Sequence, residues 1–105
     1  MPRISIAENF WRLNVKGEEK DENEYSTWVV LYRFKEKPNP RFWKNLEILT
    51  ERDEKMTTWR NSVFTENERG ALAVTSLVEH YGGEFKAFRG NQVDLSEGHR
   101  ARIPR

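Results

Sequence analysis

The segment Tyr25–Lys35 has the strongest strand signal in the chain, because it is rich in β-branched and aromatic residues. One face would carry Trp28, Val30, Tyr32 and Phe34, and the other Thr27, Val29 and Leu31 before it turns polar at Arg33. Because both faces are largely apolar, we expect an interior strand that is covered on both sides.

Apolar and polar residues alternate over Phe10–Lys16, where Trp11, Leu13 and Val15 are separated by Arg12, Asn14 and Lys16. This period of two predicts a half-buried strand. The segment 17–24 that follows has five acids and one base, so it predicts an exposed loop. The strands at Phe10–Lys16 and Tyr25–Lys35 could therefore pair as a hairpin with a long acidic loop.

Two helices are predicted by their apolar spacing and their end signals. Asn39 can cap a helix that begins with Pro40 and runs to about residue 55, with Phe42, Leu46 and Leu49 at helical spacing and Trp43 beside them. Thr65–Glu68 has the form of a capping box, which would open a second helix that runs to about Tyr81. Gly82-Gly83 predicts its end, because glycine adopts the left-handed conformation readily.

Two further strands complete the predicted order β-β-α-β-α-β. Thr57–Phe64 would be one, with Trp59 and Val63 on one face, and Glu84–Arg89 the other, followed by a turn at Gly90-Asn91. The strands that flank each helix should run parallel through right-handed crossovers, with the first strand added antiparallel. We therefore expect an α/β (α+β) fold with a small mixed sheet of about four strands and two helices, ferredoxin-like in general form. Residues 1–95 would form a single domain, and 96–105 a basic C-terminal tail.

Composition narrows the chemistry that this chain can carry. It has no Cys, so disulfides and thiolate metal sites are excluded, and its only histidines, His80 and His99, are nineteen positions apart without a zinc-ligand spacing. Neither a nucleophile elbow nor a phosphate-binding loop is present. No signal-peptide pattern and no apolar run of membrane-spanning length is visible. We expect a cytoplasmic protein that is not an enzyme, uses no metal or cofactor and does not bind membranes.

Charge is distributed unevenly although the net charge is only +1. The tail carries Arg100, Arg102, Arg105 and His99 against the single acid Glu97. Basic and aromatic residues also interleave at 41–44, 59–60 and 85–90. Aromatic rings can stack on RNA bases while nearby cations neutralise phosphates. The alternative is that these rings belong to the core and the charges to its solvated rim.

These features favour a non-catalytic RNA-binding or ribonucleoprotein-associated protein, for example one on a ribosome. Lys86, Arg89, Arg100, Arg102 and Arg105 would contact phosphates, and Trp43 or Phe88 would offer a stacking surface. The rival interpretation is a protein-interaction module, such as a viral or accessory regulatory factor, which would use the acidic segment 17–24 and exposed aromatic residues. The low net charge counts against RNA binding unless one local patch carries it.

Residues 28–89, and in particular Ser62-Val63-Phe64 within Trp59–Phe64, resemble the small CRISPR-associated Cas2 proteins. The resemblance implies a ferredoxin-like fold, with Ser-Val-Phe on a strand after the first helix. It also implies metal-dependent nuclease activity, which in that family involves an Asp at the end of the first strand. This chain has Arg33 and Phe34 there, so a nuclease is the least favoured of the three functions.

Overall fold

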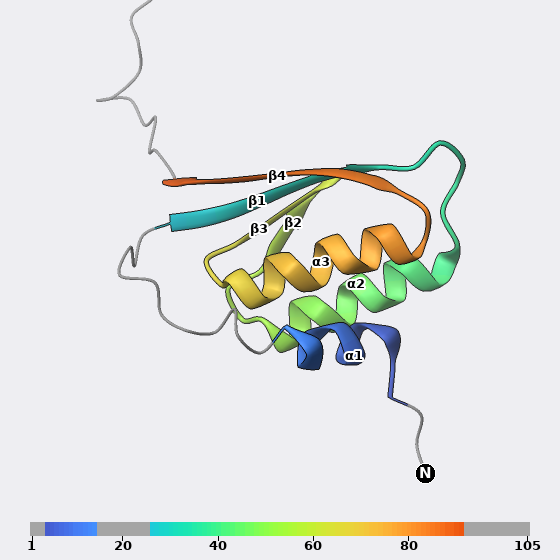
Figure 1. Cartoon of the computed structure of the whole chain (residues 1–105), viewed down its shortest axis with the longest axis horizontal. Coiled ribbons are helices and arrows are strands. Elements are labelled where there is room, and N and C mark those ends of the chain that lie inside the picture. The colour runs from blue at the N-terminus through green and yellow to red at the C-terminus, as the bar shows by residue number, and fades with distance from the viewer. Residues whose placement is uncertain (1–3, 15–25, 92–105) are drawn as a thin grey trace, which may run out of the picture.

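The computed structural model describes residues 4–14 and 26–91. Its helices and strands are, in chain order, α1 (Ile6–Leu13), β1 (Ser26–Arg33), α2 (Pro40–Arg52), β2 (Thr57–Trp59), β3 (Ser62–Thr65), α3 (Glu68–His80) and β4 (Glu84–Asn91). The described strands form one four-stranded sheet, and the described helices all lie on the same side of it (Figure 1). The predicted α+β class is confirmed, with three described helices in place of the two expected.

The strand order in the sheet is β2-β3-β1-β4, and every neighbouring pair is antiparallel. The sheet is therefore antiparallel and not mixed. β1 and β2, which flank α2, do run in the same direction as predicted, but β3 lies between them. β3 and β4, which flank α3, are likewise parallel to each other with β1 between them. The chain thus forms two interlocked split β-α-β units.

The strand predicted at Phe10–Lys16 is wrong where the structure describes it, because residues 6–13 form α1. Ala7 and Trp11, four positions apart, are both buried, so the apolar spacing is helical. Ser5 is the N-cap, and its hydroxyl oxygen accepts a hydrogen bond from the backbone N–H of Glu8 at 3.1 Å. Leu13, which the strand prediction had placed beside Trp11, is exposed instead.

The segment predicted as one strand, Thr57–Phe64, is a hairpin. β2 and β3 are joined by the two residues Arg60 and Asn61, with Trp59 opposite Ser62. A two-residue turn breaks the alternation, so Trp59 and Val63 lie on opposite faces, contrary to the prediction. Val63 is fully buried, whereas Trp59 is largely exposed.

The helix ends follow from local sequence, with one correction. Asn39 caps α2 and Pro40 is its first residue, as predicted. α3 is capped by Asn67, whose side-chain oxygen accepts from the N–H of Arg69 at 3.1 Å, and not by Thr65. The Thr65 hydroxyl donates instead to the carboxylate of Asp53, so it is engaged in a tertiary contact.

Gly82 and Gly83 end α3 in the predicted manner. Gly82 has a φ of +79°, its N–H donates to Glu79 O at 3.0 Å, and the Gly83 N–H donates to Val78 O at 2.9 Å. These two bonds form a Schellman motif. The predicted turn at Gly90-Asn91 is wrong, because β4 continues through both residues and pairs them with Thr27 and Ser26 of β1.

The core lies between the sheet and the helices, and α1 packs on α2 and α3 (Figure 1). The largest fully buried apolar side chains of the core come from the sheet, α2 and α3, and they are Phe42, Leu49, Leu77, Val30, Val63, Val74 and Val78. β1 is an interior strand, as predicted, but only one of its faces is covered by a described helix. Among the described residues, Val30 and Tyr32 face the core while Leu31 is exposed.

Two polar side chains fasten the helices to one another. Asn45 of α2 is buried, accepts from the Ala7 N–H at 2.9 Å, and donates to Arg41 O at 2.7 Å and to the Tyr81 hydroxyl at 3.3 Å. Arg69 of α3 donates to the Trp11 carbonyl at 2.6 Å, and its guanidinium lies 4.3 Å from the centroid of the Trp11 ring. These contacts explain why α1 is held on the outer side of the helix layer.

Candidate nucleic-acid interface

The sheet face opposite the helices carries two transverse rows of side chains. The strand register places Thr57, Phe64, Val29 and Phe88 in one row, and Trp59, Ser62, Leu31 and Lys86 in the next. Side chains on one face recur every second residue, so each row takes one position from each of the four strands. The two rows together bring three aromatic rings onto one surface. We call this surface the open face.

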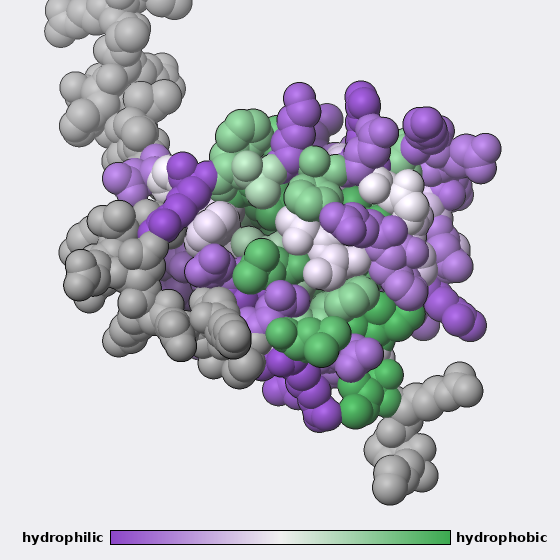
Figure 2. Space-filling view, in the orientation of Figure 1, coloured by the Kyte–Doolittle hydropathy of each residue, from purple (hydrophilic) through white to green (hydrophobic). Residues whose placement is uncertain are grey.

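The rings of the open face are accessible and line a shallow groove. Trp59 is 70% exposed, Phe88 55% and Leu31 43%, while Val29 and Phe64 are half-buried. The groove has a volume of about 440 Å³ and is lined by Thr27, Val29, Thr57, Trp59, Phe64, Phe88, Arg89, Gly90 and Asn91. Apolar and strongly hydrophilic side chains stand side by side along the edge of the molecule where the strands lie (Figure 2). A patch of this kind usually marks a binding surface.

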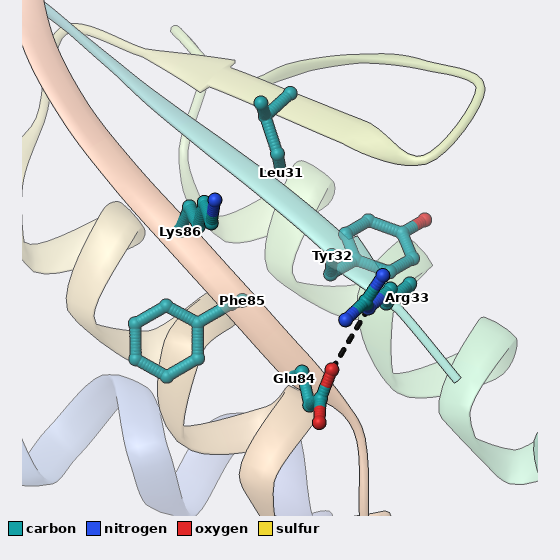
Figure 3. Close-up of a pocket in the computed structure, with 6 residues that line it drawn as sticks. All are labelled: Leu31, Tyr32, Arg33, Glu84, Phe85 and Lys86. Carbon is teal, nitrogen blue, oxygen red and sulfur yellow. Dashed lines mark hydrogen bonds and ion pairs between the residues drawn. The ribbon is translucent and has the colours of Figure 1, made fainter. Parts of the chain in front are cut away.

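A second hollow adjoins the groove at the other end of β1 and β4. It has a volume of about 410 Å³ and is lined by Leu31, Tyr32, Arg33, Glu84, Phe85 and Lys86. Leu31 and Lys86 stand on neighbouring strands, and Arg33 reaches toward Glu84 (Figure 3). The Arg33 Nε donates to the Glu84 carboxylate at 2.8 Å, and this hydrogen bond lowers the pKa of Glu84.

Acidic side chains are scarce on the open face. Among the strand positions that alternate onto it, Glu84 is the one acid that the structure describes, and it is paired with Arg33. The groove lining contains no carboxylate, and Lys86 stands in the neighbouring row. The chain as a whole has 17 acids and 18 Lys and Arg, so the described open face is basic relative to the average of the molecule.

The predicted site residues fall in three places. Lys86 and Phe88 lie on the open face. Arg89 borders the groove, but its side chain alternates to the helix side of β4, where its guanidinium lies 5.3 Å from the centroid of the Trp28 ring. Trp43 is 44% exposed but belongs to α2 on the other side of the sheet, where its ring contacts Phe42 and Tyr32. Arg100, Arg102 and Arg105 lie outside the described residues, as does the acidic segment 17–24.

Sequence reasoning did not place Phe64 and Trp59 together with Phe88. The missing signal was the turn at Arg60-Asn61, which contains neither Gly nor Pro. Once that turn is recognised, Trp59 pairs with Ser62 and shares a face with Phe64. The basic-aromatic pair Trp59-Arg60 then lies at one corner of the face that carries Lys86.

The described residues offer no alternative constellation for chemistry. No group of three potential metal ligands occurs among them. His80 is an exposed residue of α3 that packs edge-on against Phe10 and Tyr81. Asp53 is buried, but its oxygens accept from Thr65 and from the Lys55 N–H, which is a structural arrangement. No described helix is long and apolar enough to cross a bilayer.

Comparisons with known proteins found no matching family model, no matching curated protein and no matching solved structure. The resemblance to Cas2 proteins and the ferredoxin-like form therefore stay predictions. In the described structure, Ser62-Val63-Phe64 lies on β3, and β1 ends in Arg33.

Proposed function

We propose that this protein is a non-catalytic RNA-binding protein that holds a single-stranded segment on the open face. The observation that carries the proposal is the gathering of Trp59, Phe64 and Phe88 on a sheet face that no described helix covers. A four-stranded sheet that presents aromatic rings to solvent is one of the ways in which proteins bind unpaired bases.

The spacing of the rings leaves room for a separate base on each ring. Phe64 and Phe88 lie opposite Val29 from its two neighbouring strands, so they are two strand spacings apart, or about 10 Å. Half-buried Val29 fills the floor between them. Stacking of a base on an exposed ring contributes about 1–3 kcal/mol and tolerates any base, so binding should depend little on sequence.

The charges of the face complement a polyanion. Lys86 lies in the row next to Phe88, so a backbone that crosses β4 would pass close to this cation. The only described acid among the face's strand positions is already paired with Arg33. Arg100, Arg102 and Arg105 would extend the contact to phosphates along the tail, and a cytoplasmic ribonucleoprotein particle is the setting in which we expect this activity.

The test is direct binding of a fluorescein-labelled 12-nucleotide single-stranded RNA of mixed sequence, followed by anisotropy over a salt series. Phe88→Ala should weaken binding about tenfold, in keeping with the loss of one stacking contact. Trp43→Ala is the matched control, because Trp43 is a similarly exposed aromatic residue on the helix side. Circular dichroism melting would verify that both variants fold.

The possible outcomes decide whether the protein binds RNA and whether it does so through the open face. Affinity that falls steeply with salt and is lost in the Phe88 variant alone would support RNA binding. Absence of RNA binding at low salt would refute it. Equal loss in the Trp43 and Phe88 variants would contradict the assignment of the interface to the open face.

A further inference from the structure

The turn between β2 and β3 holds Arg60 in an unfavourable backbone conformation. Arg60 has a φ of +54°, and among the described residues it is the only one other than glycine with a positive φ. Two-residue hairpin loops with a positive φ at their first position normally place glycine there. An L-amino acid with a side chain is strained in this conformation, so arginine at this position costs stability.

The surrounding structure fixes this turn through both of its carbonyl groups and through the carbonyl of Trp59, which precedes it. The Ser62 hydroxyl donates to Trp59 O. The Tyr32 side chain donates to Arg60 O at 3.4 Å, and the Tyr32 backbone N–H donates to Asn61 O at 3.0 Å. The turn is therefore tied to the central strand of the sheet and is not a loose loop.

Tyr32 is a rigid anchor for the turn. Its side chain is only 4% exposed, and its ring packs edge-on against Phe34 and Phe42 with centroids 6.1 Å and 5.4 Å apart. Burial raises the pKa of the Tyr32 phenol, which keeps its hydroxyl protonated and able to donate. The strain at Arg60 is thus maintained by groups that belong to the core.

As a result, the turn holds two exposed side chains in fixed positions. Trp59 lines the groove of the open face, and Arg60 is the exposed residue that follows it. No ion pair or ring contact is found for the Arg60 guanidinium in the described part of the chain. An aromatic ring and a cation held side by side match the base and the phosphate of one nucleotide.

We infer that the Trp59-Arg60 tip is the affinity-determining element of the interface, with a base stacked on Trp59 and the adjacent phosphate paired with Arg60. This inference rests on the proposed function and deepens it. It explains why a strained arginine occupies a position where glycine would give a more stable hairpin. Tyr32 acts as a positioning residue, because it holds the carbonyls of the turn and does not reach the nucleic acid.

The decisive variant is Arg60→Gly, because binding and stability should change in opposite directions. Removal of the strain should raise the urea midpoint of unfolding, while affinity for the labelled 12-nucleotide RNA should fall about tenfold. Arg60→Asn, which tolerates positive φ and also removes the charge, should behave in the same way. Arg41→Gln, which removes one exposed cation from the start of α2, is the control and should change affinity less than twofold.

Tyr32→Phe tests the anchor without loss of any group proposed to touch RNA. We expect a twofold to fourfold loss of affinity at low salt with an unchanged salt dependence, because the number of cations stays the same. A reduced salt dependence in Tyr32→Phe would contradict the positioning role, because this substitution removes no cation.

The possible results distinguish this inference from the proposed function. If the wild type binds RNA and Arg60→Gly is stabilised but binds about tenfold more weakly, the inference is supported. If the wild type binds RNA and Arg60→Gly binds equally well, the inference is overturned while RNA binding stands. If the wild type does not bind RNA, the proposed function fails and this inference fails with it.

Discussion

Gly70 faces the buried carboxylate of Asp53 so closely that a Cβ at position 70 would overlap Asp53 Oδ2. The contact joins the first turn of α3 to the end of α2, and the same carboxylate accepts from the Thr65 hydroxyl at the end of β3. Three elements therefore meet at one acidic group. The absence of a side chain at Gly70 makes this meeting possible.

Gly70→Ala should destabilise the protein even though alanine is the better helix former. The new methyl group would displace Asp53 and approach Met56 Cε at 2.9 Å, and overpacking of this kind costs about 1–3 kcal/mol. The helix propensity of alanine offsets at most about 1 kcal/mol. Urea unfolding should therefore show a net loss of up to about 2 kcal/mol. Gly90→Ala, with no atom within 4 Å of the new Cβ, should change stability little.

Asp53 should make stability depend on pH. Burial raises the pKa of Asp53 above its ordinary value of 3.8, and the hydrogen bonds from Thr65 and the Lys55 amide only partly oppose this. Folding therefore favours the protonated carboxyl, and this contribution is present below pH 3.8 and is lost as pH rises through the folded pKa.

The measurement compares Asp53→Asn with the wild type in urea between about pH 3 and pH 7, the range around a raised carboxyl pKa. The free energy of unfolding of the wild type, relative to this variant, should decline as pH rises. Thr65→Val, which removes a hydrogen bond to the carboxylate, should steepen the decline. A relative free energy that increases with pH would mean that the folded state lowers the pKa of Asp53.

Asn45→Ala should loosen α1 from the helix layer. The substitution leaves the Ala7 N–H without its acceptor and removes the amide that donates to the Tyr81 hydroxyl. A buried donor left unsatisfied costs about 1–3 kcal/mol. We expect a loss of about 2 kcal/mol in the free energy of unfolding. Relative to the wild type, the variant should show its largest increase in amide hydrogen-exchange rate in residues 6–13. Asn9→Ala, on the exposed side of α1, should stay within about 0.5 kcal/mol of the wild type.

Lys86→Gln should reduce the salt dependence of RNA binding. One phosphate contact on a single strand contributes about −0.7 to the slope of log affinity against log salt. The slope of the variant should therefore be shallower by about 0.7, with weaker affinity at low salt. Lys44→Gln, on the exposed side of α2, should keep the wild-type slope. Equal slopes in all three proteins would exclude Lys86 from phosphate contact.

The start of α2 and the end of α3 were the most predictable features, because a cap depends on residues within one turn. Asn39-Pro40 and Gly82-Gly83 gave correct ends for α2 and α3. The Ser5–Glu8 spacing carries the same kind of signal for α1, but the alternation from Trp11 onward fits a strand equally well over so short a segment. Only burial of Ala7 and Trp11 against α2 and α3 decides between the two.

The open face was not predictable from the pattern of β1 alone. A strand that is apolar on both faces predicts cover on both sides. Here, however, Val29 and Leu31 belong to the open face, which no described helix covers. The side of the sheet that α2 and α3 cover depends on how these helices connect the strands. No single residue determines it. The position of Trp59 depends further on a turn at Arg60 that lacks glycine, so the usual turn signal is missing.

The pairing of β1 with β4 also constrains when the protein can fold during its synthesis. Ser26 pairs with Asn91, so the interior strand is made early but gains its second neighbour only after residue 91 has been synthesised. Until then a nascent chain can form the β2–β3 hairpin and pair β3 with β1, leaving one edge of β1 unpaired. Completion of the sheet is therefore a late, long-range step, and a chain truncated before β4 should be prone to association through that edge.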